Sequence, residues 1–133
     1  DHRDSGGGHH DRGHRRDVDG AGPIAAGADD PDRRRVADAM RAHPHLVGGA
    51  GREATVLMEA LPGVLAKDGA EAVFVIGLPD GRGIAVKVAD GSTRAFRAVL
   101  RAVLARLDLD GAALGEVEIL GHGQPVGTIE AVV

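Results

Sequence analysis

The sequence predicts an α/β domain of the α+β kind, in which helices pack on an antiparallel sheet. Hydrophobic residues make up 43% of the 133 residues but aromatic residues only 2%, so small aliphatic side chains must fill the core. Segments rich in β-branched residues at 71–78 and 83–90 flank the turn sequence Pro79-Asp80-Gly81, which is typical of a β-hairpin. Aliphatic residues between Phe96 and Leu107 recur at the spacing of one helical face.

The remaining elements follow from local signals. Asp30-Pro31 offers an N-cap and a proline at the first helical position, and the helix that begins there is expected to end before Pro44. We predict a loop over 43–51 and a second helix over 53–61. The other predicted elements are strands at 64–69, 71–78 and 83–90, the long helix capped by 90–93, a strand at 117–120 and a terminal segment at 126–133.

The chain divides into two compositional parts. Residues 1–20 consist of Gly, His, Arg, Asp and Ser, with Val18 as the single aliphatic side chain. Such a stretch buries too little apolar surface to offset the entropy lost on ordering, so we expect residues 1–28 to be a disordered tail. The foldable domain is expected to run over 29–133.

Charge and composition exclude several classes of function. The net charge is −4, with 16 basic and 20 acidic residues, so no global field favours nucleic acid or an anionic membrane. With no Cys there are no disulfides, thiolate metal sites or cysteine nucleophiles. No apolar run approaches the roughly 18 residues that span a bilayer. We therefore expect a soluble, cytoplasmic protein.

Few residues are candidates for chemistry. Most of the seven His lie in the expected tail, so we predict no metal site. Ser92 is best explained as a helix cap, and the arginines of the long helix (Arg94, Arg97, Arg101 and Arg106) as its solvated side. The two lysines are the strongest candidates. Lys87 fits an exposed position inside a strand, whereas Lys67-Asp68-Gly69 opens a strand and resembles the K-[ST]-G element of penicillin-recognising acyl enzymes.

Several ordered segments resemble the C-terminal part of the bacterial L-asparaginase II family, of the rhizobial, thermolabile type. They are HPHLVGG, GR-x-x-T-x-LM, the K-x-GAEA strand and GIAVKV-x-DG-x-x-RA, over about residues 32–108. This family is similar in fold to serine β-lactamases and glutaminases. The resemblance implies hydrolysis of L-asparagine to L-aspartate and ammonia through serine–lysine pairs and an acyl-enzyme.

The resemblance also implies roles for particular residues. Lys67 would be the catalytic lysine, with Lys87 as the competing candidate. Arg52, Thr55, Gly69 and Glu71 would surround the substrate. The family's S-x-x-K nucleophile segment and its zinc-binding cysteines do not occur in this sequence.

We therefore expect a truncated asparaginase, inactive alone and without a cofactor, whose substrate on completion is L-asparagine. A homodimer is compatible with this expectation. The alternative is a small non-enzymatic α/β binding or interaction domain.

Overall fold

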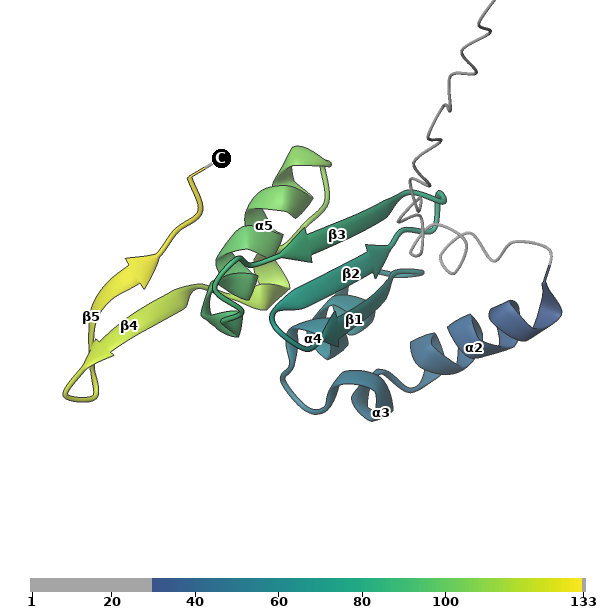
Figure 1. The fold of residues 1–133 in the computed structure, drawn as a ribbon, viewed down its shortest axis with the longest axis horizontal. Helices are drawn as coiled ribbons and strands as arrows, with labels where there is room; N and C mark the ends of the chain where they lie inside the picture. The colour runs from purple at the N-terminus through teal and green to yellow at the C-terminus, as the bar shows by residue number, and fades with distance from the viewer. Residues whose placement is uncertain (1–29, 133) are drawn as a thin grey trace, which may run out of the picture.

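A computed structural model describes residues 30–132, so the expected tail at 1–28 lies outside the described residues. Helices come first along the chain and are followed by a three-stranded antiparallel sheet, a further helix and a two-stranded antiparallel sheet, which confirms the predicted mixture of helices and antiparallel strands (Figure 1). The helices are α2 (Pro31–Ala42), α3 (Pro44–Gly48), α4 (Glu53–Ala60) and α5 (Phe96–Arg106), with the short 3-10 helices η1 (Thr93–Ala95) and η2 (Ala112–Leu114). The strands are β1 (Leu65–Gly69), β2 (Val73–Gly77), β3 (Gly83–Lys87), β4 (Val117–Gly121) and β5 (Gln124–Ile129).

The main sheet is antiparallel with the strand order β1-β2-β3, so the predicted 71–90 hairpin is confirmed. Its core face carries Phe74 and Ile76, which are buried among side chains from α4 and α5. The ring of Phe74 packs edge-on against that of Phe96, with the centroids 5.3 Å apart. The two aromatic residues of the sequence therefore meet at the contact between sheet and helix.

Local capping signals act as predicted. The Asp30 carboxylate accepts a hydrogen bond from the backbone N–H of Asp32 at 2.9 Å and caps α2. The Ser92 hydroxyl accepts one from the N–H of Arg94 at 3.3 Å. The helix that Ser92 begins opens with one 3-10 turn before α5.

Two predicted local structures are wrong. Part of the predicted loop at 43–51 forms α3, because Pro44 supplies a helical φ at its first position and Gly49, at φ +88°, ends it after one turn. Glu71 and Ala72 were predicted to lie in a strand. Instead they form the turn between β1 and β2 with φ of 56° and 54°, and β2 begins at Val73.

The second sheet consists of β4 and β5 alone. This hairpin projects from the body of the molecule beyond α5 (Figure 1). No helix among residues 30–132 is long and apolar enough to cross a membrane.

Candidate active site

The predicted catalytic lysine lies on β1, one of the two edge strands of the main sheet. Its ammonium Nζ donates to the backbone carbonyl of Asp68 at 2.6 Å and to the Asp68 carboxylate at 3.0 Å. The Lys67 side chain is about half exposed. Its charge is therefore held at the end of the strand while remaining open to solvent.

The fold brings Arg52 to the same carboxylate. Arg52 directly precedes α4, and its guanidinium Nη2 lies 2.8 Å from Oδ2 of Asp68. The Asp68 side chain is 19% exposed. Burial acts to raise the pKa of Asp68, but the hydrogen bond from Lys67 and the charges of Lys67 and Arg52 outweigh it and hold the pKa below its usual value. Two predicted site residues thus share one ionised carboxylate.

Strand register places both lysines on one face of the sheet. Lys67 is opposite Val75, and Lys87 is opposite Val73, which also faces Gly69. Residues at alternate positions share a face, so the two ammonium groups flank the two valines on the side opposite Phe74. The face that carries Phe74 packs against the helices, and the opposite face, with Val73 and Val75, carries the two lysines.

Gly69 and Glu71 mark the turn at the end of that face. Gly69 is exposed, and a β-carbon there would meet Val73 only at ordinary contact distance. The backbone carbonyl of Glu71 accepts a hydrogen bond from Nζ of Lys87 at 2.5 Å. Lys87 therefore donates to the backbone carbonyl of Glu71, whereas Lys67 donates to the backbone carbonyl and the carboxylate of Asp68.

Thr55 lies apart from this charged cluster, in the packing of α4. Its side chain is fully buried, and its hydroxyl lies 2.7 Å from the carbonyl oxygen of Gly49 and 3.2 Å from that of Pro44. The hydroxyl is thereby committed to the segment between α3 and α4. Its predicted role toward substrate stays a prediction.

Comparison with protein families identifies the chain. The family model described as L-asparaginase II matches residues 20–131. The chain belongs to the L-asparaginase II family. The match extends beyond the resemblance at both ends, and its first residues fall within the segment 1–28. A comparison with curated proteins found no significant match.

Zinc does not fit the side chains of the part of the chain that the structure describes. The sequence has no Cys, and within residues 30–132 no group of three His, Asp or Glu side chains is placed to hold a metal ion.

The nucleophile of the asparaginase scheme has no counterpart in the described residues. Ser92 is engaged in capping η1, and its own N–H donates to the carboxylate of Asp90 at 2.9 Å. The other serine of the sequence, Ser5, lies outside the described residues and is not followed by a lysine three positions later.

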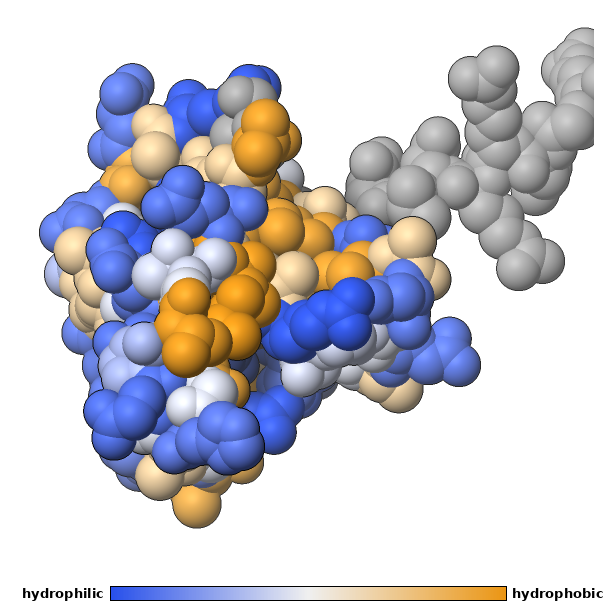
Figure 2. Space-filling model, turned by 90° about the vertical axis from the view of Figure 1, so that its left-hand side faces the viewer, coloured by the Kyte–Doolittle hydropathy of each residue, from blue (hydrophilic) through white to orange (hydrophobic). Residues whose placement is uncertain are grey.

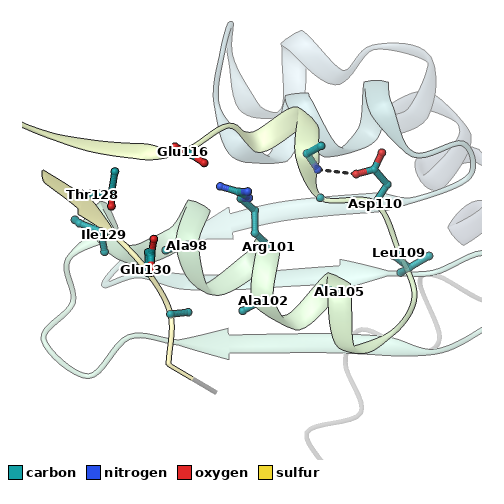
Figure 3. Close-up of a pocket in the computed structure, with 13 residues that line it drawn as sticks. Ala98, Arg101, Ala102, Ala105, Leu109, Asp110, Glu116, Thr128, Ile129 and Glu130 are labelled. Carbon is teal, nitrogen blue, oxygen red and sulfur yellow. Dashed lines mark hydrogen bonds between the residues drawn. The ribbon is translucent and has the colours of Figure 1, made fainter. Parts of the chain in front are cut away.

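A cavity of about 520 Å³ lies elsewhere, between α5 and β5 (Figure 3). Alanines of α5 line its floor, and Arg101, Glu116 and Glu130 lie around it. None of the predicted site residues lines it, so it is separate from the Lys67 cluster.

The prediction that the arginines of the long helix form only its solvated side is wrong for Arg97 and Arg101. Arg97 bonds Glu53 at 3.1 Å, the carbonyl of Leu114 at 3.2 Å and the carbonyl of Gly51 at 3.1 Å. Arg101 donates to the carbonyl of Gly115 at 3.2 Å.

Sequence analysis missed two residues that position the site. Arg97 donates to the carbonyl of Gly51, next to Arg52, and to the carboxylate of Glu53. Glu53 is 44 positions away in the sequence, so no local pattern indicates this contact. Asp68 had a signal, since an acidic residue directly follows the candidate lysine. The prediction that Lys67-Asp68-Gly69 opens a strand is wrong, because these residues are the last three of β1 (Leu65–Gly69).

Proposed function

We propose that this chain supplies the lysine side of an L-asparaginase site and that the completed site hydrolyses L-asparagine to L-aspartate and ammonia. The family match across nearly the whole chain carries the proposal. The cluster of Lys67, Asp68 and Arg52 supports it, because it gathers two of the residues implied by the family resemblance at one exposed strand end.

In the proposed reaction a serine hydroxyl oxygen attacks the side-chain amide carbon of asparagine. The hydroxyl gives up its proton as the new C–O bond forms, and the C–N bond breaks as the nitrogen takes up a proton and leaves as ammonia. Water then hydrolyses the acyl-enzyme, which releases aspartate and restores the proton of the serine hydroxyl. Lys67 partners a serine in this scheme, with its ammonium oriented by Asp68. Arg52 contributes a second positive charge, suited to a substrate carboxylate.

The serine is proposed to come from a segment outside these 133 residues. The chain alone is then inactive, requires no cofactor in its own residues and takes L-asparagine as its small-molecule partner. We propose no nucleic-acid or membrane partner. A cytoplasmic location completes the proposal.

The two lysines allow a matched test. Ammonia release from asparagine is measured for the purified chain and for a chimera in which residues 32–131 replace the matching segment of an active family member. We expect activity only in the chimera. Lys67→Ala should lower the chimera's kcat/KM by about 10²-fold or more, whereas Lys87→Ala should retain most of it.

The opposite result for the lysines would assign the catalytic role to Lys87. A folded chimera that stays inactive would favour the second reading, a non-enzymatic interaction domain. The interaction-domain alternative is supported by the observation that the described residues contain no activated nucleophile.

A further inference from the structure

The cavity between α5 and β5 takes no part in the candidate active site, and its volume of about 520 Å³ is that of a small-molecule site. Its floor is apolar, because the residues that α5 places there include Ala98, Ala102 and Ala105. Leu109 and Ile129 add aliphatic side chains to the lining. Figure 2 looks onto the side of the molecule from which the hairpin projects, where hydrophobic and hydrophilic residues lie next to each other. This side of the molecule therefore offers both apolar and charged contacts.

Charged groups of both signs surround the alanine floor. Arg101 lies on α5, Glu116 just before β4 and Glu130 just after β5. In Figure 3 the guanidinium and the two carboxylates extend toward the same space. Arg101 is half-buried, and its Nη1 donates to the carbonyl of Gly115 at 3.2 Å. That bond holds the guanidinium beside the cavity and uses only one of its N–H donors, so further donors can face an anionic group.

The two glutamates beside the cavity have no partner of their own. Within residues 30–132, the side chain of neither Glu116 nor Glu130 forms a hydrogen bond or an ion pair. Asp110, the other acidic residue of the lining, accepts a hydrogen bond from the N–H of Ala112 at 2.8 Å. One guanidinium and two carboxylates are thus gathered around an apolar floor. A molecule with one carboxylate and two ammonium groups gives each of these charges a partner of opposite sign.

We propose that this cavity binds a free dibasic α-amino acid of the kind of L-lysine. The α-carboxylate pairs with Arg101, the two ammonium groups donate to Glu116 and Glu130, and the methylene chain lies on the alanines of α5. Hydrogen bonds between ionised groups are stronger than neutral ones, so matched charge selects the ligand. A neutral amino acid leaves one glutamate without a partner, and a diamine lacks the carboxylate that Arg101 binds.

This inference does not depend on the proposed enzymatic function, and calorimetric titration of the purified chain tests it with three probes. L-Lysine should bind saturably, with a Kd in the millimolar range or tighter. L-Norleucine has the same carbon chain without the side-chain ammonium, and 1,5-diaminopentane lacks the carboxylate. Each of these two probes should bind about fivefold more weakly than L-lysine, or worse. Because the series uses the wild-type chain, its outcome does not depend on how a variant folds.

A pair of variants tests the glutamate contact. Glu130→Gln keeps the shape of the side chain and removes its charge, so L-lysine should bind about fivefold more weakly. The matched control is Glu59→Gln on α4, which does not line the cavity and should bind L-lysine as wild type does. Circular dichroism verifies that both variants fold.

A second measurement locates the bound amino acid. In NMR spectra of the chain, L-lysine should shift the backbone amide resonances of residues 98–105 and 128–131 and leave those of 65–69 on β1 unchanged. Shifts confined to 65–69 would place L-lysine at the candidate active site and refute the proposal. It would equally be refuted by a chain that does not bind L-lysine saturably, by equal binding of all three probes, or by a Glu130→Gln variant that binds L-lysine as tightly as Glu59→Gln.

Discussion

The hydroxyl of Thr55 offers a direct test of what stabilises the segment before α4. Replacing Thr55 with Val preserves the shape of the side chain and removes its hydrogen bond to Gly49, whose donor and acceptor oxygens lie 2.7 Å apart. A typical net hydrogen bond contributes about 1 kcal/mol, and an unpaired buried carbonyl costs about 1–3 kcal/mol. The carbonyl of Gly49 keeps a long contact of 3.4 Å with the N–H of Arg52, which favours the low end of that cost.

We therefore expect Thr55→Val to lower the free energy of unfolding by about 2 kcal/mol and Tm by about 10 °C. Urea unfolding followed by circular dichroism measures the first quantity, and a thermal scan the second. Thr128→Val is the matched control, because Thr128 is exposed on β5 and should change stability by less than about 0.5 kcal/mol. Equal stability of the two variants would refute the structural role of Thr55 and favour its predicted role toward substrate.

Three further predictions concern the same region. Arg97→Met loses three contacts and should cost about 2 kcal/mol of unfolding free energy in urea, whereas Arg106→Met, at an exposed position, should be nearly neutral. Because the folded-state pKa of Asp68 lies below its usual value of 3.8, Asp68 stabilises the fold above that value. That stabilisation is lost as the pH falls through the folded pKa. Unfolding measured from pH 6 down to about pH 3 should thus show a steeper loss for wild type than for Asp68→Asn, and Glu116→Gln should follow wild type. Gly48→Ala should destabilise by about 1–3 kcal/mol, because its β-carbon would stand 2.6 Å from the Thr55 hydroxyl. If Gly48→Ala unfolds at the same urea concentration as wild type, the close approach of Gly48 to the Thr55 hydroxyl is contradicted.

The sequence by itself determined the fold class, the helix caps at Asp30 and Ser92, the 71–90 hairpin and the family. These features depend on interactions within a few residues or on the order of motifs, and both can be read along the chain. It also identified Lys67 and Arg52 as site candidates, through the family resemblance. The one-turn helix at Pro44–Gly48 was missed, because so short a segment has no periodicity to detect.

Only the tertiary structure decided which side chains meet. Arg52 reaches Asp68 across 16 positions, and Arg97 reaches Gly51 across 46, through the packing of helices against the sheet. The same packing buries Thr55 and leaves Ile119 and Leu120 uncovered on the projecting hairpin. Apolar alternation along a strand indicates that a face needs covering. Which element covers it depends on where the rest of the chain, or a second chain, comes to lie.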